Sequence, residues 1–383
     1  MSEWKETTLG ETCELQRGFD LPYDQRIPGN VPVVASTGIT GWHSKAKVKG
    51  PGVVIGRSGS IGGGRYIEHD YWPLNTTLYV KDFKGNDSRF VYFLLKTIDF
   101  TVFNAGTGVP TLNRNHVASL KITLPPLATQ RRIAAVLSTL DDKIELNNRI
   151  NANLEAQAQA LFRSWFVDFE PWGGAMPEGW RKTNLDEMTS KFGTGLNPRQ
   201  NFKLGNGKNF YVTIKNMGNN RVYLDDRCDK VDDEALAKIN KRSKLQKGDL
   251  LFSGIGTIGR VAMVVDEPTN WNTSESVFNM HPADGFSSEF LYVLLLSPDF
   301  QDYVRANSQG AVQQGIRMAS LKAYTISLPP HHVLHQFDMT IQPLVEKIVA
   351  ANKEIDTLAA LRDTLLPKLM SGEIDVSRVE VPA

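Results

Sequence analysis

The sequence predicts an α+β protein in which two pseudo-repeated, mixed α/β domains are separated by two long helices that form an antiparallel intramolecular coiled coil. Three observations predict this fold. First, the chain contains an internal duplication. Second, each copy is followed by apolar residues at alternating spacings of four and three. Third, the copies contain short β-rich runs between Gly and Asn turns. We place the domains at residues 1–127 and 173–330, and the helical segments at 128–172 and 331–383.

The duplication rests on matches that occur in the same order in both copies. They are residues 4–9 with 180–185 (offset 176), 53–62 with 250–259 (offset 197), 75–76 with 272–273 (offset 197), 90–95 with 290–295 (offset 200), and the Leu-Pro-Pro runs 124–126 and 328–330 (offset 204). The offset only increases along the chain, as two collinear copies with insertions require. We infer an internal duplication.

After each Leu-Pro-Pro run, apolar residues follow the spacing of a coiled-coil seam. The seam residues that we expect to pack are Leu137, Leu140, Ile144, Leu154, Leu161, Ile341, Leu344, Ile348, Ile355, Leu358 and Leu365. Each helix would extend roughly 50 Å at 1.5 Å per residue. The alternative is that each helix packs on its own domain; the equal lengths and shared register favour pairing.

Two features interrupt the helical pattern. Asn147 and Asn151 fall within the first seam. Buried Asn can fix the register of a coiled coil, but the helix could instead fray or turn these residues to solvent. Pro367 should bend or end the second helix.

Short β-rich runs and two helices are expected inside the domains. The runs are residues 31–35, 52–56, 77–81, 210–214, 249–253 and 261–265, and the helices are near 88–96 and 288–297.

Composition indicates a globular protein of the reducing cytoplasm. Apolar residues make up 41% and charged residues 22% of the chain. The only two cysteines, Cys13 and Cys228, exclude a disulfide framework and a cysteine-based metal site. We expect neither a secretory signal nor a membrane span, because no apolar run is long enough. The net charge of +1 is only a weak indication of nucleic-acid binding.

The familiar catalytic motifs are absent or incomplete. Residues 254–259 match G-x-G-x-x-G, but a strand-like run follows instead of a helix, so we expect a glycine-rich β-turn and not a dinucleotide site. Residues 20–23 resemble a methyltransferase loop, but Leu21 breaks the motif. No phosphate loop for ATP occurs. His331, His332 and His335 could form a weak metal site, although a solvated helix start is the simpler interpretation; we expect no metal and no catalytic residue.

Four segments carry a resemblance to a known family. They are residues 176–180 (Met-Pro-Glu-Gly-Trp), 130–133 after the first Leu-Pro-Pro, 161–169 and 361–373. Together with the duplicated organisation, they resemble the specificity subunits of type I restriction–modification systems over essentially the whole chain. The two domains would then be target-recognition domains, and the helices would be the central and C-terminal conserved helices.

The resemblance implies a function and partners. Such a chain is a non-catalytic subunit that recognises a bipartite, asymmetric double-stranded DNA target. It directs two adenine-N6 methyltransferase subunits and two motor-nuclease subunits to that target. S-adenosylmethionine, ATP and Mg would be bound by those partners, and no cofactor by this chain.

Candidate DNA-binding residues come from two sources. Some are polar residues in loops that differ between the two copies, since different half-sites need different side chains, and Trp42, Lys45 and Lys47 belong to a basic, partly aromatic segment. The candidates are Trp42, Lys45, Lys47, Arg57, Ser58, Ser60, Arg65, Thr107, Thr111, Asn113, Arg114, Lys215, Asn216, Ser253, Thr257, Arg260, Gln309, Gln313, Gln314 and Arg317. Neutral loop drift would give a similar pattern, and residues 42–49 could be a solvated hairpin. Two other functions remain open: a stand-alone DNA-binding regulator that dimerises through its seam, and a degenerate methyltransferase or nucleotide-binding protein.

Overall fold

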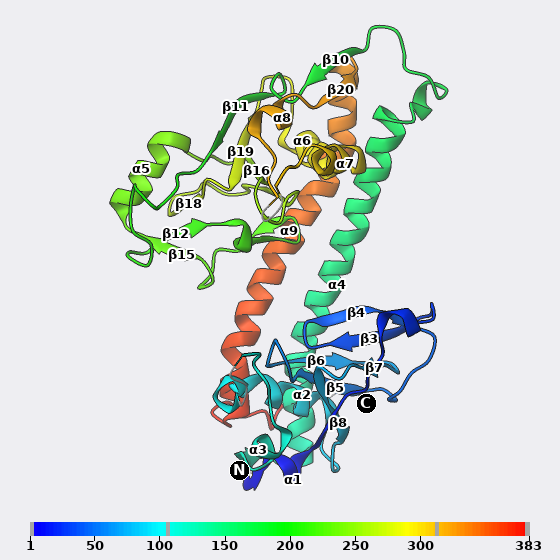
Figure 1. Cartoon of the computed structure of the whole chain (residues 1–383), viewed down its shortest axis with the longest axis vertical. Coiled ribbons are helices and arrows are strands. Elements are labelled where there is room, and N and C mark those ends of the chain that lie inside the picture. Colours follow the sequence, from blue (N-terminus) through cyan, green and yellow to red (C-terminus); the bar gives the residue numbers. More distant parts are fainter. Residues whose placement is uncertain (1–3, 105–107, 311–313, 380–383) are drawn as a thin grey trace. The chain divides into compact units, whose positions relative to one another are not determined.

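A computed structural model describes residues 4–104, 108–310 and 314–379. The chain divides into two compact units: unit 1 comprises Met1–Leu146 and Ile355–Ala383, and unit 2 comprises Asn147–Glu354. Both units mix helices with β-sheets, as predicted. Two long helices, α4 (Leu127–Phe166) and α9 (His331–Met370), each contribute one part to each unit (Figure 1).

Unit 1 is built on a four-stranded sheet with the strand order β2-β8-β5-β6. A three-stranded sheet, β4-β3-β7, and the pair β1-β9 complete its β-structure. The strands are β1 (Lys5–Thr8), β2 (Glu14–Arg17), β3 (Val31–Ala35), β4 (Gly38–His43), β5 (Gly52–Gly56), β6 (Gly62–Ile67), β7 (Trp72–Pro73), β8 (Thr77–Asp82) and β9 (Lys121–Leu124). The helices are α1 (Leu9–Thr12), α2 (Ser88–Thr97) and α3 (Arg114–Ala118).

Helix α2 closes the core of unit 1. The side chain of Asp87 caps it by accepting a 2.9 Å hydrogen bond from the backbone N–H of Phe90. Phe90 is then fully buried with Val53 and Ile55 of β5. Leu137 of α4 and Leu369 of α9 belong to the same cluster, so parts of both long helices complete this core.

Unit 2 repeats this plan with the four-stranded order β11-β19-β16-β17, the three-stranded order β15-β12-β18, and the pairs β10-β20 and β13-β14. The strands are β10 (Arg181–Asn184), β11 (Thr189–Thr194), β12 (Asn209–Val212), β13 (Met217–Gly218), β14 (Arg221–Val222), β15 (Asp229–Val231), β16 (Leu250–Ser253), β17 (Val261–Met263), β18 (Trp271–Thr273), β19 (Val277–Pro282) and β20 (Thr325–Leu328). The helices are α5 (Asp233–Ser243), α6 (Ser288–Leu296), α7 (Pro298–Ala306) and α8 (Met318–Lys322).

The duplication seen in the sequence extends to strand pairing. In unit 1, β3 pairs antiparallel with β4 and parallel with β7; in unit 2, β12 pairs antiparallel with β15 and parallel with β18. The first and last strands also match, because Lys5 lies opposite Leu124 and Arg181 lies opposite Leu328. Ser287 caps α6 as Asp87, 200 residues earlier in the sequence, caps α2. The two copies therefore share one topology.

All the expected seam residues of α4 and α9 are buried or half-buried. In unit 2, the side chain of Asn147 donates to Glu354 at 2.8 Å, and that of Asn151 donates to Asn352 at 2.9 Å. The residue numbers rise along α4 as they fall along α9, so these segments run antiparallel. In unit 1, Arg362 of α9 forms a 2.8 Å ion pair with Asp141 of α4.

The two open questions about the helices have different outcomes. Asn147 and Asn151 are buried and hydrogen-bonded to residues of α9. They therefore lie between the two helices, and the helix neither frays there nor turns them to solvent. Pro367 does not end the second helix, which continues to Met370. The backbone N–H of Ser371 still donates to the Pro367 carbonyl, because proline removes a donor but keeps its acceptor.

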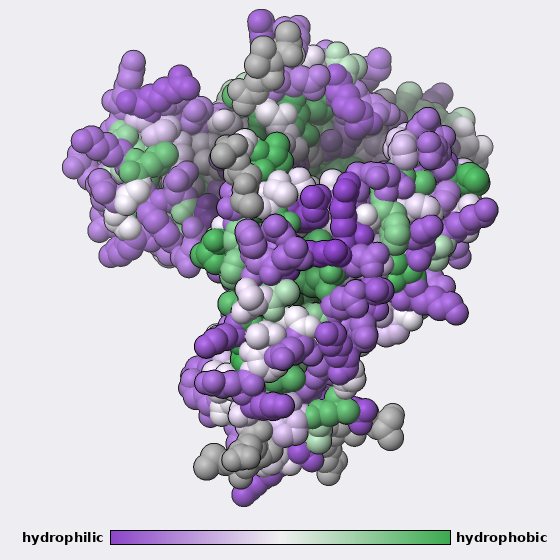
Figure 2. Space-filling model, turned by 60° about the horizontal axis from the view of Figure 1, so that its bottom comes forward, coloured by the Kyte–Doolittle hydropathy of each residue, from purple (hydrophilic) through white to green (hydrophobic). Residues whose placement is uncertain are grey.

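No helix in the described part of the chain is long and apolar enough to cross a membrane. Hydrophilic residues predominate on the face shown in Figure 2, where hydrophobic residues form scattered groups. The apolar residues gather instead in the cores of the two units.

Candidate nucleic-acid interface

A short backbone bridge in unit 1 brings together loops that are distant in the sequence. The segment after β5 lies beside residues 110–112: the N–H of Gly59 donates to the Pro110 carbonyl at 3.0 Å, and the N–H of Leu112 donates to the Arg57 carbonyl at 2.8 Å. Gly59 has a φ of +80°, a backbone conformation that residues other than glycine rarely adopt. The bridge fixes the backbone from which Arg57 projects.

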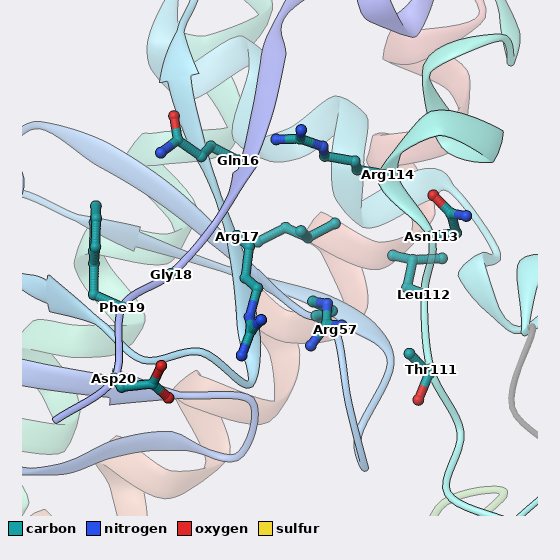
Figure 3. Close-up of a pocket in the computed structure, with 11 residues that line it drawn as sticks. Gln16, Arg17, Gly18, Phe19, Asp20, Arg57, Thr111, Leu112, Asn113 and Arg114 are labelled. Carbon is teal, nitrogen blue, oxygen red and sulfur yellow. The ribbon is translucent and has the colours of Figure 1, made fainter. Parts of the chain in front are cut away.

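The bridge forms one wall of a hollow of about 710 Å³, which we call the Arg57 hollow. It is lined by Gln16, Arg17, Gly18, Phe19, Asp20, Arg57, Leu78, Thr111, Leu112, Asn113 and Arg114. Figure 3 shows the guanidinium groups of Arg17, Arg57 and Arg114 around this hollow. Four predicted DNA-binding residues, Arg57, Thr111, Asn113 and Arg114, therefore lie in one place.

Hydrogen bonds position the polar groups of the hollow. Arg57 donates one guanidinium N–H to the backbone carbonyl of Asn75 at 3.2 Å, and the side-chain amide of Asn75 donates to the Asp20 carboxylate. The side chain of Asn113 caps α3 by accepting from the N–H of Asn115 at 3.0 Å. Arg57 has five N–H donors in all, so most remain available to a ligand.

Gln16, Arg17 and Asp20 were missed by sequence reasoning. Gln16 and Arg17 end strand β2, which lies at the edge of its sheet. Their part in the hollow depends on the pairing of β2 with β8, which no local pattern reveals. Aligning the strand ends of the two copies would have exposed the difference between Arg17-Gly18 and Thr194-Gly195.

Unit 2 contains the same backbone bridge with different side chains. The N–H of Gly256 donates to the Gln314 carbonyl at 2.8 Å, and that of Ile316 donates to the Gly254 carbonyl at 2.9 Å. Thr257, Gln309, Gln314 and Arg317 are exposed around this bridge. Residues 254–259 join the antiparallel strands β16 and β17 and open no helix, so the expected glycine turn is confirmed.

Three predicted residues have structural roles that change our expectation. Ser253 is fully buried, and its hydroxyl donates to the Thr257 carbonyl at 2.7 Å. Asn216 is buried and accepts from the N–H of Thr213 at 2.9 Å. The guanidinium of Arg260 donates to the carbonyls of Ile214 and Met217. We no longer expect Ser253 or Asn216 to contact DNA directly, and Arg260 would support the loop.

The other predicted residues are spread over the two units. Trp42 is 53% exposed on β4, and Lys45 is exposed just after it. The ammonium group of Lys47 lies 5.2 Å from the centre of the Phe19 ring. Ser58 pairs with Thr111 in the bridge, while Ser60, Arg65 and Lys215 are exposed. Thr107 and Gln313 lie outside the described residues.

The described residues contain no group of three or more His, Cys, Asp or Glu side chains suited to a metal ion. His331, His332 and His335 are exposed at the start of α9, and the ring of His331 lies 6.2 Å from that of Phe286.

Comparison with known proteins places these features in a family. Residues 1–156 and 177–355 match the model of the type I restriction modification DNA specificity domain. The match covers most of the chain, which therefore belongs to this family of non-catalytic specificity subunits. DNA target recognition is the role of that family.

Curated relatives support the same assignment. The chain is 25% identical to the type I restriction enzyme HindI specificity subunit of Haemophilus influenzae, with 98% of this chain and 100% of the relative covered. It is 26% identical to the MjaIX specificity subunit of Methanocaldococcus jannaschii, with 80% and 74% covered.

A solved structure agrees in fold. The type I restriction–modification S subunit from M. genitalium superimposes with a TM-score of 0.58 at 18% identity, covering 96% of each chain. This likeness concerns the fold alone.

Proposed function

We propose that this chain recognises a bipartite, asymmetric double-stranded DNA target and directs partner subunits to it. The observation that carries the proposal is the repeated bridge: Leu112 to Arg57 in unit 1 and Ile316 to Gly254 in unit 2. Equivalent backbone positions present an arginine in one copy and a glycine in the other. Two readers built on one framework but with different side chains suit two different half-sites.

The long helices supply the second part of the proposal. We assign residues 1–127 and 173–330 to two target-recognition domains, and 128–172 and 331–383 to helices that form an antiparallel coiled coil. The hydrogen bonds Asn147–Glu354 and Asn151–Asn352 and the buried seam residues support this pairing. Helices of fixed length between the readers would set the length of an unread spacer.

The partners follow from the family. The chain would associate with two adenine-N6 methyltransferase subunits that use S-adenosylmethionine, and with two motor-nuclease subunits that use ATP and Mg. Methylation would act on an adenine flipped into the methyltransferase subunit. This chain's own residues would bind the target and hold it in register.

The experiment is methylation-site sequencing in a host that lacks other adenine methylation. The chain together with its methyltransferase partner should give one motif with two fixed parts and a spacer of constant length. The partner without this chain should give no sequence-specific methylation. A continuous motif, or the same motif without this chain, would contradict the proposal.

A further inference from the structure

We propose that unit 1 reads a G·C base pair through Arg17 and Arg57, with Asp20 as the acceptor that completes the reading. The proposal rests on the proposed function and adds the chemical identity of one half-site. It assigns base reading to Arg17 and Asp20, which nothing in the sequence pattern indicated.

The charges of the Arg57 hollow define what it can bind. Arg17, Arg57 and Arg114 line it, and only one carboxylate, that of Asp20, is among the lining residues. Within residues 4–104, 108–310 and 314–379, no ion pair engages any of these three arginines. The hollow is therefore electropositive, and the guanidinium donors of Arg17, Arg57 and Arg114, which Figure 3 shows among its lining residues, favour an electronegative ligand.

Two ligands offer such acceptors: a DNA phosphate and the major-groove edge of guanine. The carboxylate of Asp20 distinguishes them, because a carboxylate repels a phosphate but accepts from the amino group of cytosine. Guanine presents O6 and N7 to the fork of an arginine, while its paired cytosine presents N4. The combination of guanidinium and carboxylate in one hollow matches both edges of a G·C pair.

Asp20 is held at the hollow by a defined contact. Its carboxylate accepts from the side-chain amide of Asn75, and the backbone carbonyl of Asn75 accepts from Arg57 at 3.2 Å. Asn75 thus links the acidic and basic groups. A carboxylate has lone pairs for several donors, so the contact with Asn75 leaves capacity for cytosine N4.

The second copy provides an internal comparison. Arg17 lies opposite Leu78 in the pairing of β2 with β8, and Thr194 lies opposite Phe278 in the pairing of β11 with β19. Leu78 and Phe278 are equivalent, because each pairs with a matched residue of the neighbouring strand, Ile55 or Phe252. Thr194 therefore occupies the place of Arg17.

The other two arginines are also replaced in the second copy. At the offsets of their segments, Gly254 takes the place of Arg57 (57 + 197) and Met318 that of Arg114 (114 + 204). The three guanidinium groups are thus a property of unit 1, and the G·C reading that we infer belongs to one half-site only.

The experiment uses the complex of this chain with its methyltransferase partner. Methylation-site sequencing of the unaltered complex first gives the motif, and Arg317→Ala identifies the half read by unit 2. The other half should contain an invariant G·C pair. Arg17→Ala should then relax one G·C position in that half, with preference for it falling about 5- to 150-fold. Asp20→Asn should weaken the preference at the same pair or its neighbour.

Two controls separate base reading from phosphate binding. Arg17→Lys keeps the charge but lacks the fork, so it should relax the same position as Arg17→Ala. Replacing the guanine by 7-deazaguanine in a DNA duplex removes N7, and should weaken binding by the unaltered complex more than binding by the Arg17→Ala complex, in which only Arg57 remains to contact the guanine. Thr194→Ala, at the equivalent place in unit 2, should leave the first half-site unchanged.

Several results would overturn the inference. One is a first half-site without an invariant G·C pair. Another is a uniform loss of binding at all sites with Arg17→Ala and recovery with Arg17→Lys, which would assign Arg17 to a phosphate. No change with either variant would exclude a role for Arg17. Failure of the proposed function is visible earlier, because the unaltered complex would then give no bipartite motif.

Discussion

The backbone N–H of Leu112 donates a 2.8 Å hydrogen bond to the carbonyl oxygen of Arg57, and this bond joins two loops that the sequence separates by more than fifty residues. The same bond occurs between Ile316 and Gly254 at 2.9 Å. In both units it anchors the segment after a central strand to the segment before a short helix. The backbone is repeated and the side chains are not, which is the basis of the predictions below.

Arg57→Ala and Arg317→Ala should affect different halves of the target. Each should weaken specific binding by about 1–3 kcal/mol if the side chain reads a base edge. The measurement is the methylation motif of each variant complex. Changed preference in the same half for both variants would contradict the assignment of one reader to each copy.

The isolated chain should show no catalysis of its own. We expect it neither to methylate nor to cut DNA, and not to bind ATP, since its sequence lacks the phosphate and cofactor loops of such enzymes. Assays with purified chain, labelled S-adenosylmethionine and target DNA check this. Methyl transfer that persists in the absence of any partner subunit would refute the expectation.

Phe337→Ala should strongly destabilise unit 2. Phe337 is fully buried, and its ring centre lies 4.7 Å from that of Phe166 and 5.4 Å from that of Trp165. Loss of a buried phenyl group costs about 3–5 kcal/mol. Urea unfolding followed by tryptophan fluorescence measures the change. Met339→Ala, on the same helix but 59% exposed, is the matched control and should change the free energy of unfolding by less than about 0.5 kcal/mol. Equal effects would contradict the packing described.

The two cysteines should react slowly in the folded protein. Burial raises the pKa of Cys13 to about 12, and burial also raises the pKa of Cys228. The thiolate is the reactive form, so alkylation should stay slow between pH 7 and pH 9 and become fast on unfolding. Because the folded pKa of Cys13 is raised, its contribution to stability is present below the ordinary thiol pKa and is lost as pH rises towards 12. Rapid native labelling at pH 9 would show that the thiols are accessible.

The sequence predicted much of the fold because the signals were local or repeated. The runs at 31–35 and 52–56 are strands β3 and β5 with the same bounds, and the helix expected near 88–96 is α2. The duplication found in the sequence is reflected in the strand order of the four-stranded and three-stranded sheets, which is the same in the two units. These features follow from periodicity and from turn residues, which a sequence displays directly.

The candidate site was predicted only in part, because hydrogen bonding between distant segments assembles it. Arg57 and Arg114 were found because they differ between the copies. Arg17 was missed because it lies at the end of an edge strand without a motif. Ser253 was among the predicted DNA-binding residues, but it is fully buried, and its hydroxyl donates to the Thr257 carbonyl within the glycine turn.

The central claim is that the paired helices set the distance between two readers, and a heptad insertion tests it most directly. One heptad placed after Asn151 in α4, and one before Asn352 in α9, would enter both helices at the level of the 2.9 Å bond between these residues. Seven residues keep the seam in phase and lengthen the pair by roughly 10 Å at 1.5 Å per residue. An insertion in α4 alone is the control and should disrupt the pairing.

Methylation-site sequencing of the doubly inserted variant with its methyltransferase partner gives the answer. The spacer should grow by about three base pairs, at 3.4 Å per pair, while both half-sites stay the same. Those pairs also turn the DNA by roughly 100°, so modification should be weaker than with the unaltered chain. An unchanged spacer with full activity would contradict the account, and altered half-sites would show that the helices take part in reading bases.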